Sequence, residues 1–183
     1  MRRHAFCLLL VPLLASGGEI LDSSIAVYDA HYRVSVRARI DAPPRAVYDT
    51  ITDYPALPAL TPSIRSAEIL QVLGPGRHRI RTVTEACILV FCKNVRLVQD
   101  VEQREAWQLE AVTLPEVSDF KSGLARWRLL PVDGGTELQF SQVFEPDFWV
   151  PGVIGPWLIE RLLVEEVRAT TAHIEQRFAA EQY

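Results

Sequence analysis

The change of hydrophobic period near the C-terminus constrains the fold more than any other feature of this sequence. Up to about residue 145, most segments alternate apolar and polar residues, as strands of a half-solvated antiparallel sheet do. From Gly155 onward, apolar residues recur every three or four positions over roughly 25 residues, which predicts a long amphipathic helix. The stripe consists of Ile159, Leu162, Leu163, Val167, Thr170, Thr171, Ile174 and Phe178. Most charged residues of this segment, among them Glu165 and Glu166, are expected off the stripe.

The alternating segments predict the strands that this helix must cover. They span about residues 27–40, 64–73, 77–87, 91–101, 107–113, 123–129 and 138–144. Prolines end the first segment, and short helices are expected near 46–51 and 56–60. We therefore predict an α+β fold, in which a curved antiparallel sheet of about six to seven strands wraps around the C-terminal helix. The two short helices follow the first strand.

The N-terminus has the three parts of a secretory signal peptide. Arg2 and Arg3 form a basic start, residues 5–15 are almost entirely apolar, and small residues follow at 15–18. This pattern is typical of cleavable export signals, and the apolar run is shorter than the roughly 20 residues of a membrane-spanning helix. We predict a signal peptide over 1–18, a folded domain over 26–183, and a periplasmic or secreted protein. An uncleaved anchor or a buried strand is the alternative.

Export affects how the remaining cysteines are interpreted. Cys87 and Cys92 are a disulfide candidate in an oxidising compartment, provided that residues 88–91 form a hairpin tip that brings them face to face. The alternative is a pair of buried free thiols. Two cysteines without a nearby histidine or further cysteine make an incomplete zinc site, so no metal site is predicted.

Charge and motifs exclude several functions. The formal net charge of −4 disfavours a nucleic-acid partner, which would require a basic face. The four histidines lack metal-site spacing, and there is no Gly-x-Ser-x-Gly elbow or phosphate-binding loop. We therefore predict no catalytic residues and no cofactor. His78 is the best single candidate for a polar pocket group, because parity places it on the inner face of its strand, although a satisfied core or rim histidine fits the same pattern.

Small residues between large ones on the inner strand faces predict space beneath the helix. Such a space would form a mainly apolar pocket with a few polar groups, as small-molecule sites do. The alternative is that the same side chains simply fill a core. The cavity candidates are His78, Ile80, Val95, Leu97, Gln99, Leu109, Ala111, Trp127, Phe140, Gln142, Leu162 and Leu163.

Two apolar segments are candidates for the mouth of this pocket or for transient membrane contact, because exposed apolar clusters mark interaction sites. One is the expected hairpin tip, and the other lies in the linker before the final helix. They are Ile88, Leu89, Val90 and Phe91, and Phe148 and Trp149.

The segment from Ile40 to Tyr54, with its Ile-x-Ala-Pro entry, Val47, Tyr48 and Ile51, resembles the opening of the START-like superfamily. This superfamily is also called the polyketide cyclase or SRPBCC group. Within it, the chain is most similar to the coenzyme Q-binding START-type domain family, over about residues 28–180. The resemblance implies a helix-grip fold with a hydrophobic cavity. Members bind quinones, lipids, sterols or polyketides, and some are enzymes. The predicted export signal is a departure from this family, because the similar proteins act in mitochondria or in the cytoplasm.

These observations favour non-enzymatic binding or transport of a hydrophobic small molecule, such as a lipid, an isoprenoid or a quinone-like compound. One alternative is a cyclase-like or hydrolase-like enzyme that uses polar groups in the same cavity. Another is an interaction module whose cavity is vestigial.

Overall fold

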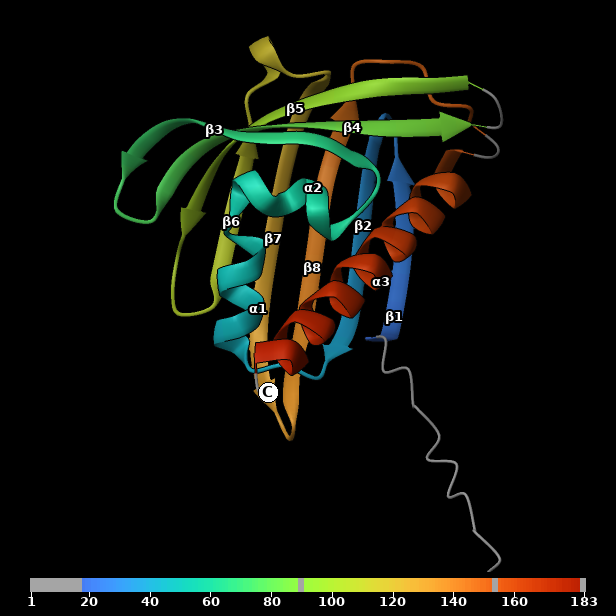
Figure 1. The fold of residues 1–183 in the computed structure, drawn as a ribbon. Coiled ribbons are helices and arrows are strands. Elements are labelled where there is room, and N and C mark those ends of the chain that lie inside the picture. Colours follow the sequence, from blue (N-terminus) through green and yellow to red (C-terminus); the bar gives the residue numbers. More distant parts are fainter. Residues whose placement is uncertain (1–17, 89–90, 153–154, 182–183) are drawn as a thin grey trace, which may run out of the picture.

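The computed structural model describes residues 18–88, 91–152 and 155–181, which form an eight-stranded antiparallel sheet with one long helix and short helical segments (Figure 1). The elements are β1 (Glu19–Tyr28), β2 (His31–Ile40), α1 (Pro44–Ile51), α2 (Leu57–Leu60), β3 (Ile64–Gly74), β4 (Arg77–Ile88), β5 (Phe91–Gln103), β6 (Gln108–Thr113), β7 (Phe120–Val132), β8 (Gly135–Pro146) and α3 (Gly155–Glu181). The strand order is β1-β2-β8-β7-β6-β5-β4-β3. The predicted α+β helix-grip fold is confirmed.

The prediction of a single strand over 27–40 is wrong, because this segment is part of a hairpin. Asp29 has a positive φ of 54°, and Tyr28 pairs with His31 across a two-residue turn. Asp is among the residues that tolerate this conformation. The alternation of apolar and polar residues continues through so short a turn, which hid the break. Strand β1 therefore begins at Glu19, ahead of the domain boundary expected at 26, and the two short helices follow the second strand.

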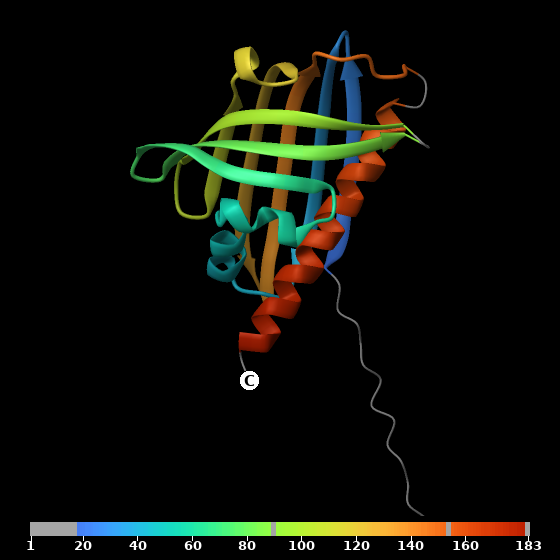
Figure 2. The same ribbon diagram turned by 45° about the horizontal axis from the view of Figure 1, so that its top comes forward.

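The sheet bends so strongly that its two ends face different directions. In Figures 1 and 2, β3, β4 and β5 run across the front of β6, β7 and β8, while α3 descends diagonally past β2 and β1. The helix is anchored at this second end of the sheet, where Val167 and Ile174 share one core with Val36, Ala38 and Ile40. In the ranges that the structure describes, no helix is long and apolar enough to cross a membrane.

Two hydrogen bonds hold the segment between β2 and α1, one from the sheet and one to α3. Thr136 on β8 is fully buried, and its hydroxyl donates a hydrogen bond to the carbonyl of Ala42 at 2.7 Å. The backbone N–H of Asp41 donates to Glu175 Oε1 on α3 at 2.8 Å. These bonds pair the buried Thr136 hydroxyl and one oxygen of the buried Glu175 carboxyl, so they orient α1 and the lower part of α3 together.

Gly135 cannot be replaced at this junction without a shift of the backbone. A Cβ atom there would overlap the backbone carbonyl oxygen of Ile40, which no change of rotamer can move aside. We expect Gly135→Ala to lower the free energy of unfolding by about 1–3 kcal/mol in urea denaturation. Gly152→Ala is the control, because no atom lies within 4 Å of the added methyl group. Equal stability of the two variants would contradict this packing.

Candidate ligand groove

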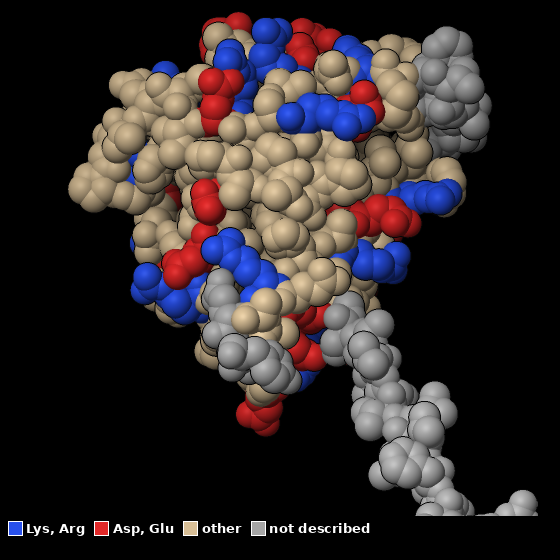
Figure 3. Space-filling model, viewed as in Figure 1, with Lys and Arg blue, Asp and Glu red and all other residues tan. Residues whose placement is uncertain are grey.

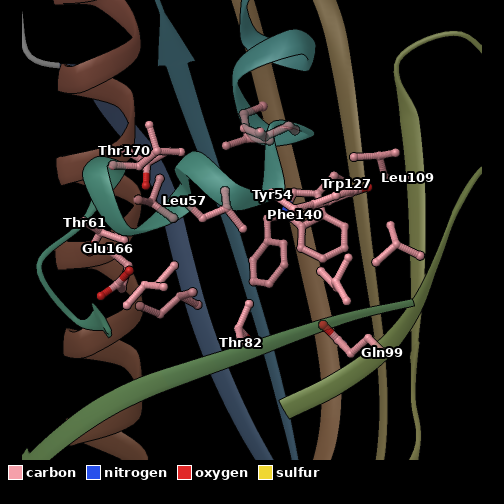
Figure 4. A pocket seen from close by; sticks show the side chains of 18 residues that line it. Tyr54, Leu57, Thr61, Thr82, Gln99, Leu109, Trp127, Phe140, Glu166 and Thr170 are labelled. Carbon is pink, nitrogen blue, oxygen red and sulfur yellow. The ribbon is translucent and has the colours of Figure 1, made fainter. Parts of the chain in front are cut away.

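Two apolar chambers lie between α3 and the inner face of the sheet. The first, of about 270 Å³, is bounded by the α1–α2 region, the middle of the sheet and the central part of α3 (Figure 4). Its lining residues are Ile51, Tyr54, Leu57, Leu60, Thr61, Ile64, Ile80, Thr82, Gln99, Val101, Leu109, Trp127, Leu138, Phe140, Leu163, Glu166, Val167 and Thr170.

The second chamber, also about 270 Å³, lies nearer the start of α3. Aromatic rings dominate one side of it: Phe120 packs edge-on against both Phe144 and Phe148, with centroid distances of 5.7 and 5.8 Å. The lining residues are Thr84, Ala86, Val95, Leu97, Phe120, Gln142, Phe144, Pro146, Phe148, Trp149, Val150, Pro151, Gly155, Leu158, Ile159 and Leu162.

Strand register shows that the chambers follow one another along the same elements. On β4, Ile80 and Thr82 line the first chamber, and the next inward residues, Thr84 and Ala86, line the second. Strands β5 and β8 behave in the same way, and α3 contributes residues 163–170 to the first chamber and 155–162 to the second. Because 15 residues of α-helix span about 22 Å, the two chambers together extend over roughly that length, and we refer to the pair as the groove.

The polar groups of the first chamber lie at different ends of it. Glu166 projects from α3 on one side, next to Thr61, and Gln99 lies on the sheet side (Figure 4). Gln99 is buried, and its side-chain amide group donates a long hydrogen bond of 3.5 Å to Thr113. Ser63 donates a hydrogen bond to Glu166 Oε1.

Burial raises the pKa of the Glu166 carboxyl, because desolvation disfavours its charged form. The Thr61 hydroxyl acts in the opposite direction on this pKa, yet it is buried without a hydrogen-bond partner of regular geometry. Among the described residues, no lysine or arginine contributes to the pKa of Glu166. Burial likewise raises the pKa of Tyr54 to about 12, so its phenol is neutral at physiological pH.

The structure places most of the predicted cavity residues along this groove. Ile80, Gln99, Leu109, Trp127, Phe140 and Leu163 line the first chamber, and Val95, Leu97, Gln142 and Leu162 line the second. Ala111 is fully buried in the adjoining core and does not line either chamber. His78 also lies outside both, with its ring 5.7 Å from that of Tyr54.

The cysteine pair lies at the end of the groove near the second chamber. Cys87 and Cys92 face each other across β4 and β5, and their sulfurs are bonded at 2.06 Å. An oxygen of Glu85 and both sulfurs lie within 4.8 Å of one another, but a disulfide offers no thiolate to a metal. Of the apolar tip, Leu89 and Val90 lie outside the described residues. Phe148 and Trp149 line the second chamber.

The polar end of the first chamber was not predicted from the sequence. Glu166 was expected off the apolar stripe, although it follows Leu163 by three residues and precedes Thr170 by four, which places all three on one helix face. That spacing was the available signal. Thr61 had none, because its burial depends on how the α2–β3 connection meets α3.

Comparisons with known proteins agree with this architecture. The sequence matches the family described as polyketide cyclase / dehydrase and lipid transport over residues 31–179. A search of curated proteins gives no match.

Solved structures with the same fold cover most of the chain. A START superfamily protein from Mycobacterium smegmatis has a TM-score of 0.68 and 22% identity, over 79% of this chain and 97% of that protein. The Zhui aromatase/cyclase from Streptomyces sp. R1128 has a TM-score of 0.65 and 16% identity, over 80% of this chain and 95% of that protein. A STAR-related lipid transfer protein from Xanthomonas axonopodis has a TM-score of 0.63 and 13% identity, over 83% of this chain and 98% of that protein. At these identities the similarity concerns the fold.

A curved sheet that holds a long C-terminal helix over an apolar groove defines a START-like, or SRPBCC, protein. The sequence match narrows this class, and the chain belongs to the polyketide cyclase / dehydrase and lipid transport family.

Because the pKa of Glu166 is raised, the free energy of unfolding should depend on pH through this residue. A carboxyl whose folded pKa lies above its ordinary value of 4.5 contributes stability that is fully present below that value and is lost as the pH rises through the folded pKa. Relative to Glu166→Gln, the unmodified protein should therefore lose unfolding free energy between pH 4 and pH 8, as followed by urea denaturation at each pH. Glu165→Gln, at an exposed position of the same helix, should leave the pH profile unchanged. Parallel profiles for the unmodified protein and Glu166→Gln would contradict the assignment.

Proposed function

We propose that this protein binds or transports a hydrophobic small molecule, such as a lipid, an isoprenoid or a quinone-like compound, in the groove between α3 and the sheet, without catalysing a reaction. The observation that carries the proposal is the pair of apolar chambers. Small-molecule sites typically have volumes of roughly 300–1,000 Å³, and each chamber alone has about 270 Å³. Their lining is largely aliphatic and aromatic, with few polar groups.

Binding is favoured over catalysis by the position of the histidine that would be the best catalytic candidate. His78 lies outside both chambers, against Tyr54. A cyclase-like reaction in the groove would have to rely on Glu166, Gln99 and the hydroxyl groups nearby. Glu166 is the one carboxyl among the described residues that line the two chambers, and no histidine, lysine or arginine lines them. A single carboxyl beside hydroxyl and amide groups suits the orientation of a ligand better than general acid–base catalysis by a paired acid and base.

Filling the groove tests this proposal. Thr82→Phe adds an aromatic ring to the first chamber and Thr84→Phe adds one to the second. We expect each to weaken ligand binding about tenfold, which corresponds to roughly 1.4 kcal/mol. Binding would be measured by native mass spectrometry and lipid extraction of the purified protein lacking residues 1–17. Val112→Phe, at an exposed position on β6, is the control. A protein that carries no hydrophobic compound, and takes up none from a bacterial lipid extract, would contradict the proposal.

We further propose that the protein is exported and exchanges its ligand at a membrane surface through the mouth of the second chamber. Trp149 lines this chamber with 82% of its surface exposed, and Trp157 nearby on α3 is 60% exposed. The Lys93 ammonium nitrogen lies 4.3 Å from the ring centroid of Phe148, and the guanidinium carbon of Arg161 lies 5.5 Å from the ring centroid of Trp157. Exposed aromatic rings next to cations suit an anionic lipid surface.

Removing the most exposed ring should weaken this contact. We expect Trp149→Ala to reduce co-sedimentation with vesicles containing phosphatidylglycerol about fivefold or more, which is within the range for losing one large interfacial side chain. Val72→Ala removes a 67%-exposed apolar side chain near the β3–β4 turn, at the other end of the molecule in Figure 1, and should leave co-sedimentation unchanged. Equal co-sedimentation of the two variants would argue against the proposed membrane-contact surface.

A further inference from the structure

Both chambers are mainly apolar, but among the described residues only the first is lined by a carboxyl group, and this difference gives the groove a direction. The first contains the Glu166 carboxyl together with the hydroxyls of Thr61 and Thr170. The second offers aromatic rings and aliphatic side chains, and its polar lining residues, Thr84 and Gln142, carry no charge. An amphiphile in this groove would therefore place its head group in the first chamber and its chain in the second.

The head group must fit the surroundings of Glu166. One carboxyl oxygen accepts a hydrogen bond from Ser63, while the buried hydroxyl of Thr61 lies next to this carboxyl without a hydrogen bond of regular geometry. A buried hydroxyl without a well-formed hydrogen bond is costly, so a ligand that bonds to it is favoured. An uncharged hydroxyl head can donate to the Glu166 carboxyl and accept from Thr61 at the same time.

The same surroundings disfavour an anionic head. In the part of the chain that the structure describes, no lysine or arginine acts electrostatically on Glu166. A second carboxylate would be buried next to the first without a counter-ion, which is strongly unfavourable. The groove should therefore discriminate between two ligands with the same chain, according to the charge of the head group.

We propose that the groove binds an elongated, single-chain amphiphile with an uncharged hydroxyl head, which contacts Glu166 and Thr61 in the first chamber while its chain extends along α3 into the second. This proposal rests on the proposed function and specifies the ligand class for the same groove.

The test compares hexadecanol, hexadecanoate and hexadecylamine at pH 7 by native mass spectrometry, using the protein lacking residues 1–17. We expect hexadecanol to bind about tenfold or more tightly than hexadecanoate, corresponding to at least 1.4 kcal/mol. In Glu166→Gln, hexadecanoate should bind more tightly than in the unmodified protein, and the preference should fall to about twofold. This gain of binding cannot result from misfolding. Glu165→Gln is the matched control and should keep the original preference.

A second comparison tests the direction of the chain. Thr84→Phe fills the second chamber, so it should weaken binding of hexadecanol while leaving that of the shorter octanol within about twofold. Equal losses for both alcohols would overturn the proposed orientation.

The other outcomes separate this proposal from the proposed function. Tight binding of hexadecanoate that Glu166→Gln does not change would overturn the hydroxyl head while leaving hydrophobic binding intact. Tighter binding of hexadecylamine than of hexadecanol would overturn it as well, since Glu166 would then act as a counter-ion. If none of the three compounds binds and the protein takes up nothing from a lipid extract, both proposals fail.

Discussion

The structure depends on where the apolar stripe of α3 docks on the curved sheet. Val167 and Ile174 pack into the core formed by β2, β7 and β8, and the Asp41–Glu175 hydrogen bond fixes the same end of the helix. Strands β3, β4 and β5 belong to the same sheet but bend across the front of the molecule, as Figure 2 shows. The helix therefore fills one side of the concave face and leaves space toward the other, and that space is the groove.

The surface of the molecule follows the same division. Around the centre of the view in Figure 3, where β3, α2 and α3 meet, charged side chains are sparse, while they gather above and below. On the outer face of the sheet, ion pairs such as Arg79–Asp100 and Arg126–Glu110 satisfy the charges locally. The Arg79 guanidinium lowers the pKa of Asp100 by hydrogen bonding, and Arg104 and Arg126 do the same for Glu110. Glu166 has no such partner among the described residues, which distinguishes it from the surface carboxylates.

The hydrophobic period of the helix and the alternation of apolar and polar residues along the strands predicted most of the fold and much of the groove lining. Both are local properties of a strand or helix. The alternation in 77–101 placed Ile80, Gln99 and Leu97 on the inner face, where the structure has them. Features that depend on how distant segments meet were missed. A two-residue turn at Asp29 preserved the alternation and hid β1. Glu166 was expected off the apolar stripe, because its contacts with Ser63 and Thr61 depend on how the α2–β3 connection meets α3.

Ligand binding requires that the space beside α3 is not filled by protein side chains. A crystal structure of the protein lacking residues 1–17, grown with hexadecanol, tests this most directly. We expect continuous elongated density from Glu166, past Leu163 and Leu162, to Trp149. Side chains of Phe140, Leu163 and Leu162 packed directly against β4 and β5, with no space between the two chambers and no density along the helix, would contradict it.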